Sequence, residues 1–164
     1  MNSAEIITIG DELLIGQTVD TNSAWMGMQL SMRGIRVNRI TSISDRREEI
    51  IAALDESLGR VPLVLMTGGL GPTSDDITKE TLAEYFGTKL VLNQEVLEEV
   101  TARITRRNLE MNENNRRQAM VPESCRVLAN HAGTAPAMLF RKEGKLIVSM
   151  PGVPSEMKHI MQEH

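Results

Sequence analysis

Residues 67–76 read Thr67-Gly68-Gly69-Leu70-Gly71-Pro72-Thr73-Ser74-Asp75-Asp76, directly after the apolar run 61–66. A buried strand that leads through a glycine-rich turn into a helical pattern is typical of a parallel α/β sheet. Glycine has no Cβ atom, so a phosphate can approach the main-chain N–H groups of the turn, where the dipole of the next helix is favourable. The stretch therefore predicts an anion-binding turn at a strand-to-helix junction.

Two adjacent carboxylates, Asp75 and Asp76, follow the glycine turn. A phosphate oxygen about 4 Å from a bare carboxylate is repelled by roughly 4 kcal/mol at an effective dielectric constant near 20, which exceeds the attraction of one helix terminus. A divalent cation between the two groups would remove this conflict. In the alternative interpretation, Ser74 caps the helix and the two aspartates only complement its dipole.

The composition is that of one ordinary globular domain over residues 1–164. Hydrophobic residues make up 41% of the chain, and no Pro/Gly/Ser-rich linker or membrane-length apolar run interrupts it. Cys125 is the only cysteine, which excludes an intrachain disulfide and a zinc site built on cysteine pairs. We therefore expect a cytoplasmic protein.

The charge and the aromatic content argue against two classes of partner. The net charge is −4, whereas nucleic-acid binding draws on clustered positive charge. Base-stacking platforms are also not expected, because the only aromatic residues are Trp25, Tyr85, Phe86 and Phe140. We therefore expect no nucleic acid and no membrane as partner.

The hydrophobic pattern predicts strands and helices that alternate through most of the chain. Strands are expected at 5–9, 35–43, 61–66 and 89–92, and helices at 20–33, 45–58, 75–86 and 94–108. Short strands are expected at 125–128, 137–141 and 146–149, with a hairpin turn at Glu143-Gly144-Lys145 and a helix at 155–164. This order implies an α/β fold with a largely parallel sheet, helices on both faces and at least one antiparallel edge pair.

A second acidic pair, Asp11 and Glu12, lies in the turn 10–16 after the first strand. The carboxyl ends of parallel strands meet at one edge of a sheet, so this turn is expected near the glycine turn. Together with Asp75 and Asp76, the pair would supply the hard oxygen ligands that magnesium or manganese needs. Considered alone, Asp11 and Glu12 are equally explained as residues that cap a helical turn.

Five motifs follow one another along the chain. They are Gly10-Asp11-Glu12-Leu13-Leu14 with Asp20-Thr21-Asn22, the turn 67–76, Asn115-Arg116-Arg117-Gln118-Ala119, Gly133-Thr134-Ala135-Pro136 and Pro151-Gly152-Val153-Pro154-Ser155-Glu156-Met157. Together they resemble the amino-terminal domain of the competence/damage-inducible CinA family over nearly the whole chain. The resemblance implies a molybdopterin-binding, MoaB/MogA-like fold: a three-layer α/β/α sandwich around a mostly parallel sheet with an antiparallel edge.

The resemblance also implies an activity, the metal-dependent hydrolysis of ADP-ribose to AMP and ribose 5-phosphate, and therefore a small-molecule nucleotide substrate as partner. The implied cofactor is a divalent metal (magnesium, manganese or cobalt), with or without a monovalent cation. Many family members carry a carboxy-terminal deamidase domain, which we expect to be absent from this chain. The alternative is a molybdopterin- or nucleotide-binding domain that does not hydrolyse its ligand, as in the related molybdenum-cofactor biosynthesis proteins.

The roles of individual residues follow from the same resemblance. Asp75 and Asp76 would be catalytic, and the metal would be bound by Asp11, Glu12 and Asp76. The phosphate and the rest of the ligand would be bound by Thr67, Gly68, Gly69, Gly71, Pro72, Thr73, Asn130, Gly133 and Thr134. Ala137 stands where the family usually has glycine, and its methyl group is expected to obstruct the ligand or shift the loop.

The end of the chain suggests a further role. The helical pattern 155–164 reaches the last residue without a cap or a glycine stop. Either this terminus frays, or the sequence is a piece of a longer protein and serves as an oligomerisation platform for a missing partner domain. We expect a homo-oligomer.

Overall fold

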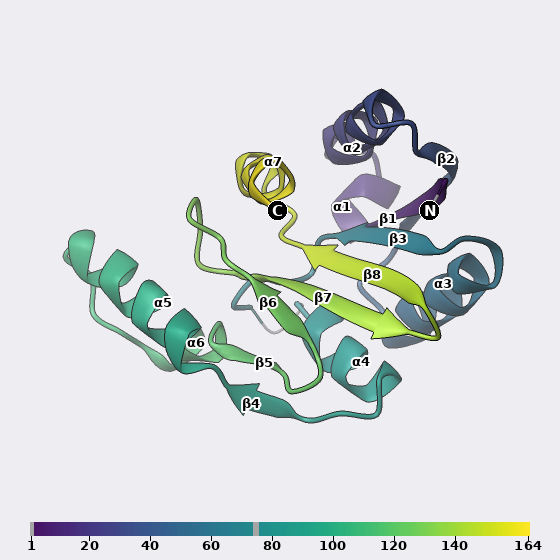
Figure 1. The fold of residues 1–164 in the computed structure, drawn as a ribbon. Coiled ribbons are helices and arrows are strands. Elements are labelled where there is room, and N and C mark those ends of the chain that lie inside the picture. Colours follow the sequence, from purple (N-terminus) through teal and green to yellow (C-terminus); the bar gives the residue numbers. More distant parts are fainter. Residues whose placement is uncertain (1, 74–75) are drawn as a thin grey trace.

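A computed structural model describes residues 2–73 and 76–164 and places a six-stranded sheet between helices (Figure 1). The strand order is β2-β1-β3-β8-β7-β6. The strands are β1 (Ser3–Ile9), β2 (Arg36–Ile43), β3 (Leu63–Thr67), β6 (Arg126–Leu128), β7 (Ala137–Lys142) and β8 (Lys145–Met150). The first four strands of this order pair in parallel, and β7 pairs antiparallel with both β8 and β6. The predicted mostly parallel sheet with an antiparallel edge is confirmed.

Helices cover both faces of the sheet and complete a three-layer arrangement. On one face lie α2 (Thr21–Met32) and α7 (Pro154–Glu163), and on the other lie α3 (Arg47–Arg60) and α4 (Thr78–Tyr85) (Figure 1). Both faces of the sheet need a cover, because the apolar side chains of neighbouring residues in β1 point to opposite faces. Ile6 packs in the cluster that contains Met26 of α2, whereas Ile7 packs in the cluster that contains Leu54 of α3.

A smaller lobe lies beside the main sheet. It contains β4 (Leu90–Leu92), α5 (Gln94–Arg106), α6 (Glu113–Arg117) and β5 (Met120–Pro122), and β4 pairs antiparallel with β5 (Figure 1). The apolar side chains of Val96, Val100 and Ile104 pack against Ala119. The sequence predicted β4 and α5 but missed α6, which has no apolar period, and β5, which is only three residues long.

Other local predictions are confirmed or corrected at particular residues. The β7–β8 hairpin turns at Glu143 and Gly144, which both have positive φ angles (51° and 77°), as a two-residue turn of this kind requires. The turn after β1 contains a short helix, α1 (Asp11–Leu14), whose first turn holds Asp11 and Glu12. The predicted helical turn is therefore present, but neither residue caps it: the N-cap is Gly10, and no side chain forms a cap hydrogen bond.

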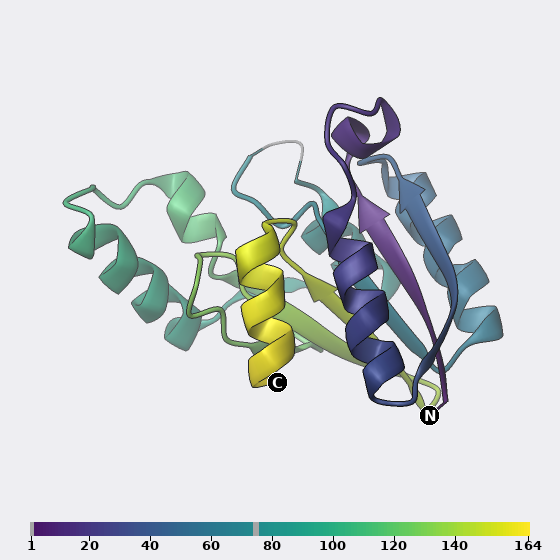
Figure 2. The same cartoon turned by 90° about the horizontal axis from the view of Figure 1, so that it is seen from above.

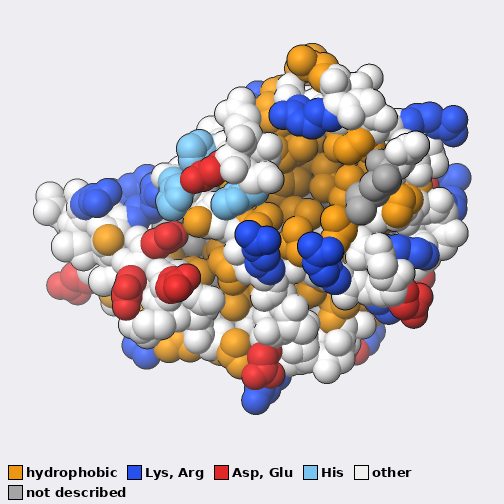
Figure 3. Space-filling view, in the orientation of Figure 1, with side chains coloured by type: hydrophobic (Ala, Val, Ile, Leu, Met, Phe, Trp, Pro, Cys, Tyr) orange, Lys and Arg blue, Asp and Glu red, His pale blue; other side chains and the backbone are white. Residues whose placement is uncertain are grey.

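The surface carries an apolar groove of about 240 Å³ between α2 and α7. Figure 3 shows hydrophobic side chains gathered on this face, with Lys and Arg side chains beside them.

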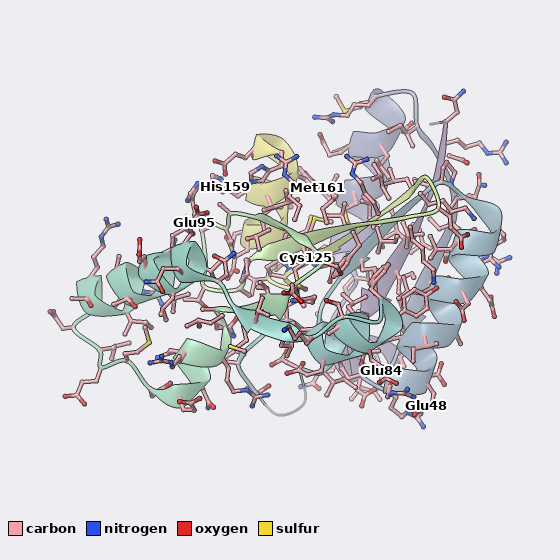
Figure 4. All side chains as sticks on the ribbon, turned by 60° about the horizontal axis from the view of Figure 1, so that its bottom comes forward. Glu48, Glu84, Glu95, Cys125, His159 and Met161 are labelled. Atoms are coloured by element: carbon pink, nitrogen blue, oxygen red, sulfur yellow. The ribbon has the colours of Figure 1, made fainter. Side chains whose placement is uncertain are left out.

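Arg47 pairs with Glu48 of its own helix and with Glu84 of α4, and the second pair ties the two helices together (Figure 4). No helix in the described part of the chain is long and apolar enough to cross a membrane. The homo-oligomer stays a prediction.

Candidate functional site

A pocket of about 430 Å³ opens at the carboxyl ends of β1, β3 and β8. Figure 2 shows this end of the molecule, where α1 projects beyond β1. Segments far apart in the sequence line the pocket, namely Ile9, Gly10, Glu12, Asp45, Gly68, Gly69, Leu70, Gly71, Pro72, Asp76, Gln118, Thr134, Ala135, Pro151, Gly152, Val153 and Glu156. Ligand sites of open α/β sheets form at this end of the strands, as the sequence predicted.

Gly68 and Gly69 permit the close packing of the glycine turn. Gly68 has a φ of 114°, and a Cβ atom on it would lie 2.1 Å from the carbonyl oxygen of Ile9. Gly69 has a φ of 67°, and its Cβ would lie 2.0 Å from the hydroxyl of Thr78. A side chain at either position would push the turn away from β1 or from α4.

The main-chain N–H groups of the turn differ from the prediction in two respects. The Gly68 N–H is not free, because it donates to the carbonyl of Met150 at 3.1 Å. The turn also does not lead directly into a helix, since α4 begins at Thr78, whose N–H donates to the Gly69 carbonyl at 3.2 Å. Ser74 and Asp75 lie outside the described residues, so the catalytic role of Asp75 and the alternative cap by Ser74 stay predictions.

Three consecutive N–H groups remain for an anion. Those of Gly69, Leu70 and Gly71 donate to no other described residue. All three residues line the pocket. Successive amides in such a turn form an anion-binding concavity without the help of a helix dipole.

Four carboxylates line the same pocket, from Glu12, Asp45, Asp76 and Glu156. Burial raises the pKa of the Asp45 carboxyl above its ordinary value, and the charges of Glu12, Asp11 and Asp76 add to this effect. Asp11 does not line the pocket, and its N–H donates to the Asp45 carboxylate at 3.1 Å. The structure therefore brings together two of the predicted metal ligands, Glu12 and Asp76, with Asp45, which the sequence reasoning missed.

These carboxylates partly fit the implied metal. Among residues 2–73 and 76–164, no group of three or more His, Cys, Asp or Glu side chains is arranged to hold one ion. Magnesium, however, is usually bound by one or two carboxylates together with the phosphates of a substrate. The donor set at this pocket matches that pattern, and the metal stays a prediction.

Asp76 also shapes the turn. Its Oδ2 accepts hydrogen bonds from the N–H of Thr73, at 3.0 Å, and from the Thr73 hydroxyl. Thr73 is exposed and lines a small neighbouring hollow that it shares with Lys79. Any substitution of Asp76 must therefore preserve an acceptor for Thr73 if the turn is to keep its shape.

Thr67 lies behind the pocket, not in its lining. The residue is 3% exposed, and its hydroxyl donates to the carbonyl of Pro151 at 2.8 Å and accepts from Asn22 at 3.2 Å. The Asn22 amide also donates to the carbonyl of Gly152 at 2.8 Å. Thr67 and Asn22 thus hold in place the loop that joins β8 to α7.

Asn130 holds a second loop in place, the one that contains Ala132, Gly133 and Ala135. Its amide nitrogen donates to the Ala135 carbonyl at 2.8 Å and to the Glu156 carboxylate at 2.6 Å. Its oxygen accepts from the N–H groups of Ala132, at 3.0 Å, and Gly133, at 2.9 Å. Asn130 therefore orients the loop and Glu156 without lining the pocket itself.

The remaining predicted residues divide between the lining and its surroundings. Thr134 and Pro72 line the pocket, whereas Gly133 does not. A Cβ on Gly133 would lie 2.0 Å from the Glu156 carboxylate, so this glycine leaves room for that side chain. Ala137 is fully buried on the α7 side of the sheet and does not line the pocket, so its methyl group does not obstruct this space.

Three polar side chains of the lining received no role from the sequence: Asp45, Gln118 and Glu156. Signals for them existed, because Asp45 follows the carboxyl end of β2. Gln118 and Glu156 belong to motifs 115–119 and 151–157, which were recognised as motifs only. Their side chains meet at the pocket only after the chain has folded.

Lys79, beside the site, carries a prediction about pH. The residue is 7% exposed, and its side-chain ammonium donates to the Arg117 carbonyl at 2.9 Å. Burial lowers the pKa of Lys79 to about 8. The negative charge of Glu80 acts to raise this pKa, and the positive charge of Arg117 acts to lower it. Between pH 8 and 10.5, Lys79 therefore carries its proton more often in the unfolded chain than in the folded one. The free energy of unfolding consequently rises with pH in this range, by at most about 1.4 kcal/mol per pH unit from this residue.

The test is Lys79→Met, measured by urea denaturation from pH 7 to 10.5. The free energy of unfolding of the wild type, relative to this variant, should increase with pH above 8 and stay level below it. Lys89→Met, which removes an exposed lysine, is the control. A flat difference across the whole range would show that Lys79 keeps its proton as readily as in the unfolded chain.

Comparison with known proteins agrees with this geometry. Residues 5–164 match the family described as "Probable molybdopterin binding domain". A CinA-like protein of Cytophaga hutchinsonii is 49% identical over 160 residues, which are 98% of this chain and 38% of the relative. A putative competence-damage inducible protein of Caldicellulosiruptor saccharolyticus is 44% identical over 98% of this chain and 39% of its own length. The chain thus spans about two fifths of these relatives.

Solved structures give the same result. The protein CinA of Thermoplasma acidophilum, described as of unknown function, superposes with a TM-score of 0.90 at 34% identity. The match covers 99% of this chain and 95% of the Thermoplasma chain. The tungsten cofactor synthesizing protein MoaB of Pyrococcus furiosus superposes with a TM-score of 0.64 at 20% identity, over 99% and 89% of the two chains, and shows the fold alone. The chain therefore belongs to the CinA family and has the MoaB/MogA-like fold of its molybdopterin-binding domain.

Proposed function

We propose that the chain binds a phosphate-bearing heterocyclic compound, a molybdopterin-type pterin or a nucleotide, in the pocket at the carboxyl ends of β1, β3 and β8. The observation that carries the proposal is the row of N–H groups at Gly69, Leu70 and Gly71, three pocket-lining residues whose N–H groups donate to no other residue among 2–73 and 76–164. A volume of about 430 Å³ lies within the usual range for small-molecule sites. The family description and the fold of the relatives support the same class of ligand.

A second candidate function is hydrolysis of a nucleotide pyrophosphate bond, ADP-ribose to AMP and ribose 5-phosphate. The carboxylates of Glu12 and Asp76, which line the pocket with the free amides, favour it. A divalent cation bound there would supply the positive charge that draws phosphate toward these carboxylates and would lower the pKa of a bound water. In this proposal, the amides of the turn hold the phosphates, while Glu12 and Asp76 hold the cation.

Two measurements separate these functions. Calorimetric titration with ADP-ribose and with 6-hydroxymethylpterin diphosphate measures binding. Release of AMP from ADP-ribose, with magnesium, manganese or cobalt and with a chelator, measures hydrolysis. Binding without AMP would support the binding domain and reject the hydrolase, and metal-dependent AMP would support both proposals. Failure of all ligands to bind would reject both.

Asp76→Asn tests the role of the carboxylate without removing the acceptor for Thr73. The asparagine oxygen can still accept from the Thr73 N–H, but the negative charge that would hold a cation is lost. If the chain hydrolyses ADP-ribose, we expect the rate of AMP release to fall about 100-fold or more.

The matched control for this variant is Glu95→Gln, which removes one exposed carboxylate on α5 outside the pocket lining (Figure 4). Its activity should equal that of the wild type. Full activity in Asp76→Asn would place the cation elsewhere.

A further inference from the structure

The side chain of Gln118 is enclosed but has no partner. Gln118 directly follows α6, and its N–H donates to the Asn115 carbonyl at 3.2 Å. The residue is 1% exposed, yet neither Nε2 nor Oε1 forms a hydrogen bond within residues 2–73 and 76–164. Each unpaired buried group costs about 1–3 kcal/mol, so nearly all buried side-chain amides in folded proteins have a partner. This amide therefore indicates a group that is bound next to it.

Gln118 lines the pocket proposed above, together with Gly71 and Asp76. It reaches the pocket from the lobe of β4, α5, α6 and β5, and Figure 2 shows α6, drawn in green, at the same end of the molecule as α1. The side chain thus approaches a bound ligand from outside the main sheet. The glycine turn and the acidic residues approach from the sheet itself.

The chemistry of the lining distinguishes Gln118 from its neighbours. The free N–H groups of the turn only donate hydrogen bonds, and the ionised carboxylates only accept them. The Gln118 amide presents a donor, Nε2, and an acceptor, Oε1, side by side. A phosphate, which only accepts, would leave Oε1 unpaired. A planar ring edge with an acceptor beside a donor would satisfy both atoms.

We propose that Gln118 is a specificity-determining residue that binds the hydrogen-bonding edge of the ligand's heterocycle. The Nε2 group donates to a ring acceptor, and Oε1 accepts from the N–H beside it. Adenine offers this pair at a ring nitrogen and the 6-amino group, and a pterin offers it at the 4-oxo group and the neighbouring ring N–H. This inference rests on the proposed function, because it requires the ligand to lie in that pocket.

Gln118→Met tests the inference, because methionine keeps the length of the side chain but removes both hydrogen-bonding atoms. Calorimetry compares ADP, 6-hydroxymethylpterin diphosphate and inorganic pyrophosphate, which has no heterocycle. We expect the Kd of the recognised heterocyclic diphosphate to rise about tenfold or more. The Kd of pyrophosphate should not change. The heterocycle that loses affinity identifies the class of ligand. Gln94→Met, an exposed glutamine on α5, is the control.

The outcomes separate this inference from the proposed function. Equal losses for pyrophosphate and the heterocyclic compounds would assign Gln118 a purely structural role and overturn the inference. Unchanged affinities would overturn it as well, while the binding function would stand. If the wild type binds no diphosphate, both fail.

Gln118→Asn provides a second variant should the methionine disturb folding. It keeps an amide but withdraws it by one methylene group. The same selective loss is expected, confined to the heterocyclic compounds, and thermal unfolding verifies that the variant is folded. Wild-type affinity for both heterocyclic compounds in this variant would overturn the proposal.

Discussion

Gly68→Ala is expected to abolish ligand binding, with a loss of affinity of at least about 100-fold, and to destabilise the fold by about 2 kcal/mol or more. The new Cβ would lie 2.1 Å from the main-chain oxygen of Ile9 and 3.0 Å from its carbonyl carbon. Main-chain atoms of a central strand cannot move aside as a flexible side chain can. The backbone would also keep a φ of 114°, which strains any residue other than glycine. The turn must therefore shift, and its free amides shift with it.

Gly59→Ala is the matched control for this prediction. Gly59 lies in α3, and a Cβ there would meet nothing within 4 Å. Alanine within a helix is favoured over glycine by roughly 0.5–1 kcal/mol, so this variant should be slightly more stable and should bind ligand normally. Urea denaturation and calorimetric titration of both variants give the comparison. Normal affinity in Gly68→Ala would show that the turn does not hold the ligand.

Arg60→Ala is expected to lower the free energy of unfolding by about 2–3 kcal/mol at pH 7. Glu5 lies in β1 and is 1% exposed, and the Arg60 guanidinium at the end of α3 binds both of its carboxylate oxygens at 2.8 Å. These hydrogen bonds hold the pKa of the Glu5 carboxyl below its ordinary value, although burial acts in the opposite direction. Without Arg60, the buried carboxylate would keep only the smaller favourable effects of Ser57 and of the Arg39 charge.

The stability difference between the wild type and Arg60→Ala should depend on pH. In the wild type, the contribution of the pair is complete above the ordinary pKa of Glu5, 4.5, and is lost as the pH falls through the lowered folded-state value. In Arg60→Ala, burial still favours the protonated carboxyl and only Ser57 and the charge of Arg39 oppose it, so acid relieves part of the penalty. The difference in stability between the two proteins should therefore shrink from pH 7 toward pH 4.

Glu56→Gln provides the control for the arginine. Glu56 is an exposed partner of the same guanidinium at 3.4 Å, and its loss should cost less than about 0.5 kcal/mol. Chemical denaturation at several pH values measures both variants. Equal effects of Arg60→Ala and Glu56→Gln at pH 7 would contradict the assigned role of the buried pair.

Much of the fold was predictable because its signals are local. The apolar run 61–66 indicated a buried strand, and it forms β3. The helical spacing of Ile50, Leu54 and Leu58 indicated α3, where all three residues are buried. The helix expected at 20–33 forms α2, and the Asp20 side chain accepts from the Ser23 N–H at its start. Such features depend on residues within one or two turns of each other.

The misses occur where distant residues decide the structure. The sequence placed the start of a helix at residue 75, but α4 begins at Thr78, whose N–H is bound by the carbonyl of Gly69. The strand β5 consists of three residues and exists because it pairs with β4, almost thirty residues earlier. A short segment has too little periodicity to reveal such a partner.

By itself, the sequence determined which segments are buried, where the glycine turn lies and to which family the chain belongs. These depend on hydrophobic spacing, on the absence of a Cβ atom and on the order of the motifs. Only the tertiary structure decided that Asp45, Gln118 and Glu156 share one pocket with Glu12 and Asp76. The physical reason is that the strand order brings four carboxyl ends together, and that burial and hydrogen bonding then determine which polar groups remain free for a ligand.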